Sequence, residues 1–210
     1  MTDTTTDRTT IRDMVEAWVV WRDSGQWDRL ATLWHDDAIM SATWQQRSAA
    51  DFIAASRAAW AAGVDVEHFL GGMTIDIGEH ASHRAITQTK MTIGQRAAVH
   101  GVLVDVTCEG RFYDFFERRA GRWGIVLRQP IYERDRMDVV APGATIVLDP
   151  AILERYPSGY RHLAYLQIDC GMTVKTDMPG RTGPEVDHLY RRGAAWLAGA
   201  AGHPAAAAYG

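Results

Sequence analysis

A change in the spacing of apolar residues near Val64 is the feature that most limits the folds open to this chain of 210 residues. Before Val64, apolar residues recur every three or four positions, which is typical of amphipathic helices. After it they recur every second position, which is typical of strands with one buried face. Helices followed by a run of strands, with no alternation of the two, predict an α+β protein.

The first of three predicted helices begins at an S/T-x-x-D cap formed by Thr10 and Asp13, after a polar and frayed start. It is expected to end near Asp23, where Ser24-Gly25 interrupts the pattern. The apolar residues of this helix are Ile11, Met14, Val15, Trp18 and Trp21.

Two further helices are predicted before the strands begin. A short one covers residues 27–34 and is followed by His35-Asp36-Asp37, which is interpreted as a polar loop. A second cap, Ser48 with Asp51, opens an alanine-rich helix that ends at Gly63.

The period-two region predicts a long antiparallel meander with the helices closing one side of a strongly curved sheet. Gly71-Gly72 indicates a bulge, and Arg119-Ala120-Gly121 indicates a tight hairpin turn. The strands are expected at about 64–77, 83–94, 98–117 and 122–133.

The chain changes character after Asp135, where prolines and glycines divide it into short pieces. We expect a domain over residues 1–135 and an extension over 136–200 that forms helices near 159–169 and 184–198. The extension has little core of its own, so it is interpreted as a lid or a dimer arm packed on the first domain. The low-complexity segment 201–210 is expected to be disordered.

Composition excludes several classes of protein. A net charge of −4 leaves no basic surplus for nucleic acid or anionic lipid, and no apolar run approaches the length that spans a bilayer. Cys108 and Cys170 are too few for a disulfide framework, which suits a cytoplasmic protein. Eight tryptophans predict a large interior lined by aromatic rings.

His68 and Asp23 are the first candidates for chemistry. His68 is in phase with Val66 and Leu70, so it points to the apolar side of its strand and needs a partner. Asp23 stands at the negative end of a helix, where a carboxylate needs compensation. Alternatively, His68 is a core histidine bonded to a backbone carbonyl, and Asp23 caps an ordinary turn.

Arg128 lies on the last predicted strand and faces either solvent or a cavity. Pro130 is expected to coincide with a bulge or a sheet edge, because proline removes a ladder hydrogen bond. No histidine or cysteine spacing fits a metal site, and no glycine-rich phosphate loop is present, so no metal or nucleotide cofactor is predicted.

The order of these elements and the run DSGQWDRLATLWHDDA resemble the SnoaL-like branch of the nuclear-transport-factor-2-like superfamily over roughly residues 8–135. Within it the chain is most similar to the group of scytalone dehydratase, bile-acid 7α-dehydratase and hexachlorocyclohexane dehydrochlorinase. The resemblance implies a cone-shaped α+β barrel with a deep apolar pocket and an Asp–His dyad at Asp23 and His68. It also implies catalysis without a metal or organic cofactor, and an arginine in the site at Arg128.

Two departures from the group matter. The lysine that assists halide departure in the dehydrochlorinase falls on Trp18, and the tyrosine that dehydratases place near the aspartate is absent from the first helix. A tyrosine elsewhere is expected to substitute for it. The predicted substrate-binding residues are Trp18, Trp44, Tyr113, Tyr132 and Tyr160.

Together these features predict a cofactor-independent lyase that uses Asp23, His68 and Arg128 as its catalytic residues. Dehydration and retro-aldol-type C–C cleavage of a hydrophobic hydroxylated aromatic or polycyclic molecule both fit. An isomerase or polyketide cyclase with the same dyad, and a small-molecule-binding domain without catalysis, remain as alternatives. The chain is also expected to form a dimer or a trimer.

Overall fold

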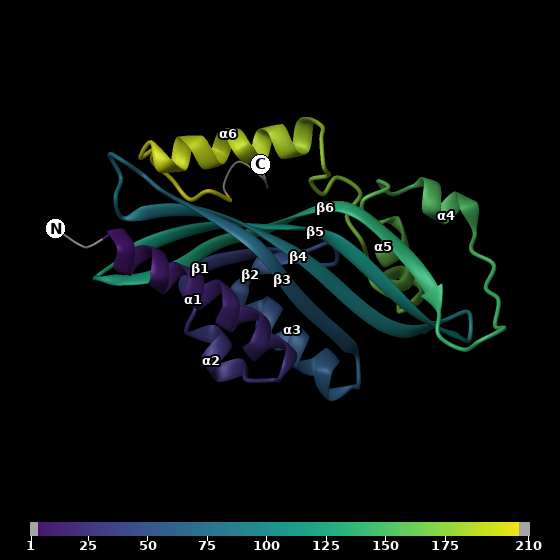
Figure 1. Cartoon of the computed structure of the whole chain (residues 1–210). Coiled ribbons are helices and arrows are strands. Elements are labelled where there is room, and N and C mark those ends of the chain that lie inside the picture. Colours follow the sequence, from purple (N-terminus) through teal and green to yellow (C-terminus); the bar gives the residue numbers. More distant parts are fainter. Residues whose placement is uncertain (1–3, 206–210) are drawn as a thin grey trace.

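One strongly curved sheet of six strands organises the computed structural model, which describes residues 4–205 (Figure 1). The strand order is β2-β1-β6-β5-β4-β3, and the parallel pair β1 and β6 is the exception among antiparallel neighbours. The predicted α+β class is confirmed, with the sheet open rather than closed. The strands are β1 Trp34–Ser41, β2 Gln46–Ser48, β3 Asp65–Ile77, β4 Arg84–Val99, β5 Val102–Arg119 and β6 Arg122–Val139.

Helix α1 spans Thr4–Asp23 and packs along β3. It ends where expected, but the predicted cap at Thr10 is wrong, because Thr10 lies inside the helix and its hydroxyl donates to the Thr6 carbonyl. The early turn is stabilised from a distance: Asp7 accepts hydrogen bonds from Arg118 and Trp123 on the sheet. These contacts between distant parts of the chain outweigh the local cap signal.

The second helix and the polar segment after it also differ from expectation. Helix α2 covers only Trp27–Ala31, and His35-Asp36-Asp37 belongs to β1 rather than to a loop. Strand β1 forms because β6 supplies a parallel partner from far along the sequence. Helix α3, Ala49–Ala61, begins at the predicted cap, where the Asp51 N–H donates to Ser48 Oγ at 3.1 Å.

The long strands agree with the alternating pattern. Register shifts between Leu70 and Met73, which confirms the irregularity predicted at Gly71-Gly72. The turn between β5 and β6 places Ala120 at φ 48° and Gly121 at φ 80°, a left-handed pair that suits a tight hairpin. Pairing of β1 with β6 ends at Arg128, so Pro130 lies where β6 has lost that neighbour.

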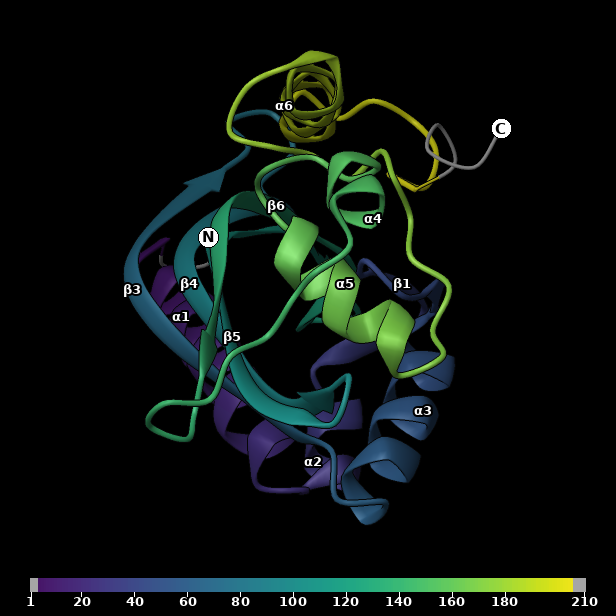
Figure 2. The same cartoon turned by 90° about the vertical axis from the view of Figure 1, so that its right-hand side faces the viewer.

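The extension covers two different parts of the sheet. Strand β6 continues through the expected boundary at Asp135, and α4 (Pro150–Glu154) and α5 (Arg161–Asp169) follow. Figure 2 shows α5 lying across the open end of the curved sheet. Helix α6, Pro184–Leu197, packs on the outer face instead (Figure 1).

Alternation of side chains gives the sheet two apolar faces. The concave face joins α1, α3 and α5 in the main core, and the outer face packs under α6 in a second cluster. Gly193 of α6 lies against Tyr113, so closely that a Cβ there would overlap the tyrosine hydroxyl. Because α6 packs closely on the outer face, a cavity can form only on the concave face of the sheet.

The segment after α6 returns toward the sheet. Residues 201–205 follow α6, and Ala205 is buried in the second cluster. The expectation for residues 206–210 lies outside the described residues. Within residues 4–205, no helix combines the length and apolar character needed to cross a membrane.

Candidate active site

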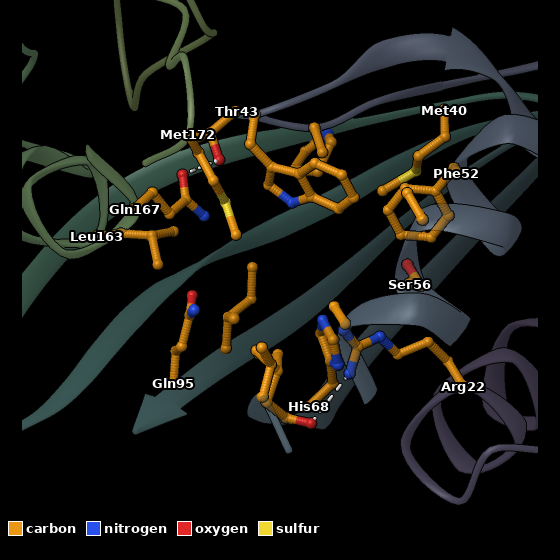
Figure 3. A pocket seen from close by; sticks show the side chains of 18 of the residues that line it. Arg22, Met40, Thr43, Phe52, Ser56, His68, Gln95, Leu163, Gln167 and Met172 are labelled. Carbon is orange, nitrogen blue, oxygen red and sulfur yellow. Dashed lines mark hydrogen bonds between the residues drawn. The ribbon is translucent and has the colours of Figure 1, made fainter. Parts of the chain in front are cut away.

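A cavity of about 240 Å³ lies between the concave face of the sheet and helices α1, α3 and α5 (Figure 3). Its walls are mainly apolar: Ile93 and Phe112 come from the sheet, Phe52 from α3 and Leu163 from α5. An apolar cavity with a few polar groups is typical of a small-molecule site.

Asp23 and His68 meet at one wall of this cavity. Asp23 is the last residue of α1, and His68 faces the cavity from β3. The carboxylate accepts the His68 backbone N–H through Oδ2 at 2.6 Å, and Oδ1 lies 2.9 Å from Nδ1. Because a carboxylate can only accept, Nδ1 carries the proton, which leaves the lone pair of the neutral ring on Nε2.

The surroundings hold His68 in its neutral form. Burial is the largest effect and lowers the pKa of the imidazole below its usual value. The hydrogen bond and charge of Asp23 raise this pKa, while the charges of Arg22 and Arg128 lower it. The net direction is downward, so the ring is unprotonated at neutral pH.

Arg22 is a cavity residue that the sequence reasoning missed. Its Nη1 donates to Asp23 Oδ1 at 3.2 Å and to the Val66 carbonyl at 3.0 Å. Its Nε is buried and has no hydrogen-bond partner among residues 4–205. The signal was available, because Ile11, Val15, Trp18 and Arg22 follow one helical stripe.

Arg128 faces the concave side of the sheet but does not line the cavity. Its Nε and Nη2 each donate to an oxygen of Asp114 at 2.7 Å, and neither side chain is exposed. The guanidinium carbon lies 4.3 Å from the Trp18 ring and 4.1 Å from the Phe112 ring. These rings separate Arg128 from the cavity. The position of Arg128 therefore does not fit the direct contact with a ligand that the sequence predicted.

The predicted aromatic residues divide into two groups. Trp18, Trp44 and Tyr132 line the cavity. Tyr113 lies on the outer face under α6, and the hydroxyl of Tyr160 donates to the Lys175 carbonyl outside the cavity. The expectation of ligand contact therefore does not match the positions of Tyr113 and Tyr160. For Tyr113 the reason is that alternation alone does not tell which face of a strand is concave, and for Tyr160 it is that the residue precedes α5, whose docking depends on the tertiary fold.

A second set of polar groups lies where α5 meets the cavity. Gln167 of α5 and Thr43, which follows β1, both line it, and the Thr43 hydroxyl donates to Gln167 Oε1 at 2.8 Å. Gln95 of β4 lines the same cavity and is buried. None of these residues was singled out by sequence. For Gln167 the reason is that α5 reaches the site only through the tertiary fold.

The chain contains a second aspartate–histidine contact of the same form. Asp135 Oδ1 lies 2.8 Å from His162 Nδ1, and Oδ2 accepts the His162 backbone N–H at 2.6 Å. Asp135 also accepts the Leu163 N–H at 2.8 Å, so it holds the first turn of α5 on the sheet. His162 does not line the cavity that holds His68.

No group of three or more His, Cys, Asp or Glu side chains that could hold a metal ion occurs within the described part of the chain. The polar groups around the cavity include the Asp23–His68 pair, Arg22 and the amides near α5, together with the hydroxyls of Thr43, Ser56 and Tyr132.

This fold and cavity define a SnoaL-like protein, and the chain belongs to that family: the SnoaL-like domain matches residues 3–129. An uncharacterized protein of Emericella nidulans is 36% identical over 207 residues, covering 92% of this chain and 87% of the relative. Pea pathogenicity protein 2 of Fusarium vanettenii is 37% identical over 202 residues, covering 92% and 86%. Both alignments reach well beyond the matched domain into the extension.

Solved structures show the same fold at low sequence identity. A candidate scytalone dehydratase from Novosphingobium aromaticivorans aligns with a TM-score of 0.53 at 15% identity, covering 67% of this chain and 96% of that one. A hexachlorocyclohexane dehydrochlorinase, LinA type 2, aligns with a TM-score of 0.51 at 14% identity, covering 68% and 94%. The SnoaL-like membership inferred from sequence is confirmed by the family match, and these solved structures show that the fold is shared.

Proposed function

We propose that the chain is a cofactor-independent lyase in which His68 removes a proton from a small hydroxylated substrate. The observation that carries the proposal is the 2.9 Å contact between Asp23 Oδ1 and His68 Nδ1 at the wall of an apolar cavity. Asp23 orients the ring and compensates the positive charge that His68 gains on protonation. Burial favours this role, because it lowers the pKa of His68 and keeps the base unprotonated at neutral pH.

In a dehydration, Nε2 of His68 takes a proton from the carbon next to the hydroxyl-bearing carbon. The electron pair of that C–H bond becomes the new double bond, and the C–O bond breaks with its pair going to oxygen. The departing hydroxyl then takes the proton back from the imidazolium, so that water leaves and His68 is regenerated. In a retro-aldol cleavage of a β-hydroxy carbonyl compound, His68 takes the hydroxyl proton and the freed electron pair on oxygen forms a new C=O bond. The C–C bond breaks with its pair going to an enolate, which takes the proton back from the imidazolium.

Arg22 is proposed to stabilise the negative charge that develops on an oxygen of the substrate. Arg22 lines the cavity, and its buried Nε has no acceptor within residues 4–205. An unsatisfied buried donor costs about 1–3 kcal/mol, which an oxygen of a ligand would recover. In this role Arg22 replaces Arg128, which does not line the cavity and whose Nε and Nη2 are engaged by Asp114.

The cavity volume narrows the substrate class. A cavity of roughly 150 Å³ suffices for benzene. The cavity of about 240 Å³ therefore suits one ring with a few substituent atoms better than a fused polycyclic system. Helix α5 is proposed to act as the lid, since Leu163 and Gln167 close this space from the extension.

The test is a screen of single-ring hydroxylated compounds with protein that has been treated with a chelator. Mass spectrometry detects the loss of water or of a carbonyl fragment from each compound. We expect turnover by the wild-type protein and a loss of about 10²–10⁴-fold in His68→Ala. A His68→Ala variant that keeps activity within about threefold, or activity abolished by the chelator, contradicts the proposal. A product of unchanged mass would instead indicate an isomerase.

A further inference from the structure

The side of the cavity next to α5 carries polar groups that the Asp23–His68 chemistry does not use. Gln167 lies outside the matched SnoaL-like domain, yet its side chain is buried and reaches the cavity. Figure 3 shows Gln167 and Gln95 on one side of the cavity and Arg22 on the other. The cavity thus has two separate polar regions with apolar walls between them.

Thr43 determines which end of the Gln167 amide faces the cavity. The Thr43 hydroxyl donates to Oε1 at 2.8 Å in a buried contact, so the oxygen is engaged. The amide nitrogen is then the end presented to the cavity, as Figure 3 shows. This nitrogen has no acceptor among residues 4–205.

Gln95 provides a second amide in the same region. Gln95 is paired with Val66 of β3. The next inward-facing residue of β4 is Ile93, which is paired with His68. Gln95 is 5% exposed, and its side-chain amide has no hydrogen bond within the described chain. Both carboxamides face the cavity without complete protein partners, so a ligand or water in the cavity must satisfy them.

We propose that Gln167 is a specificity-determining residue that donates a hydrogen bond to a neutral acceptor oxygen of the substrate, on the side away from Arg22. The substrate class is then a single ring bearing a carbonyl or ether oxygen in addition to the group that reacts at His68. The inference rests on the proposed function only in placing the substrate in this cavity. A neutral oxygen is favoured over a carboxylate because two amides compensate poorly for burying a charge.

Binding of two small probes tests this inference without any turnover. The probes are 4′-hydroxyacetophenone and 4-ethylphenol, which have similar shape but differ in the carbonyl oxygen. Isothermal titration calorimetry of the wild-type protein is expected to show that the ketone binds at least about tenfold more tightly than 4-ethylphenol. One specific hydrogen bond accounts for a difference of this size. Gln167→Leu should bring the two affinities within about threefold, while 4-ethylphenol still binds.

Three further variants separate recognition from folding. Gln167→Glu keeps the size of the side chain but replaces the donor by an acceptor, so it should bind the ketone less well than 4-ethylphenol. Thr43→Val should reduce the preference, because the amide is no longer held in one orientation. Gln129→Leu, a matched change on β6 outside this cavity, should leave both affinities unchanged.

The inference is overturned if the wild-type protein binds both probes equally or binds neither, or if Gln167→Leu keeps the preference for the ketone. These outcomes are independent of the His68→Ala result. If the protein proves to have no lyase activity but still prefers the ketone, the recognition role of Gln167 stands. If it has lyase activity but binds the two probes equally, only the recognition role of Gln167 is removed.

Discussion

Replacing Asp23 by asparagine changes one atom at the centre of the proposed site. The carboxylate of Asp23 accepts three hydrogen bonds, from the backbone N–H of His68 at 2.6 Å, from Nδ1 of His68 at 2.9 Å and from Nη1 of Arg22 at 3.2 Å. In Asp23→Asn the amide oxygen can retain the backbone contact. The amide nitrogen then faces Nδ1, which must accept a hydrogen bond and therefore loses its proton.

The expected effect follows from this change of tautomer. When Nδ1 accepts, the ring proton resides on Nε2, and the nitrogen that faces the substrate can no longer act as a base. We expect kcat/KM to fall by about 10²–10⁴-fold, which corresponds to roughly 3–5 kcal/mol of lost transition-state stabilisation. Loss of charge-assisted hydrogen bonds at this partly buried carboxylate should also lower the free energy of unfolding by about 1.5–3 kcal/mol.

Asp135→Asn is the comparison variant, because Asp135 contacts His162 with nearly the same geometry outside the cavity. Its loss is expected to act on the cavity only through the position of α5, whose first turn Asp135 holds. Urea unfolding of both variants should show comparable destabilisation. Steady-state kinetics on a substrate found in the screen should show that Asp23→Asn loses far more kcat/KM. The reasoning is refuted if Asp23→Asn stays within about threefold of the wild type, or loses no more activity than Asp135→Asn.

Two other predictions concern the charges around His68. Because burial depresses the pKa of His68, kcat/KM should stay on its plateau above the usual histidine pKa of about 6.5 and fall only as pH drops through the lower folded-state value. Arg22→Gln removes a nearby positive charge, so this limb should move to higher pH with a lower plateau, and an unchanged midpoint would argue against the electrostatic role of Arg22. Arg128→Lys should mainly impair folding, since lysine cannot keep both 2.7 Å contacts to the buried Asp114, and breaking such a pair costs about 3–5 kcal/mol. A variant with normal unfolding in urea but reduced kcat would show that Arg128 has a direct role in chemistry.

Local periodicity singled out His68 and Asp23 as candidates, and the family resemblance implied that they form a dyad. His68 was placed on the inward face by its phase with Val66 and Leu70, and Asp23 was placed at a helix end by the Ser24-Gly25 break. The structure brings the two side chains together. Arg22 escaped attention although it continues the buried stripe of α1, because a charged residue next to a helix end is usually solvated.

The features that sequence did not predict depend on distant partners. Strand β1 contains the polar run His35-Asp36-Asp37 and forms through parallel pairing with β6. Arg128 and Tyr113 lie on regular strands, but the pattern does not say that rings cover Arg128 or that α6 covers Tyr113. Gln167 reaches the cavity only because Asp135 holds the start of α5 on the sheet. Each of these depends on packing between segments far apart in the chain.

Helix α6 gives the outer face of the sheet an intramolecular cover, and this has a consequence for self-association. Val186, Leu189 and Trp196 shield apolar residues of the long strands from water. Two copies of this chain therefore cannot join through these covered strands while α6 is docked. A change that releases α6, such as a charged residue at Leu189, would turn a local loss of packing into an exposed apolar patch that favours aggregation.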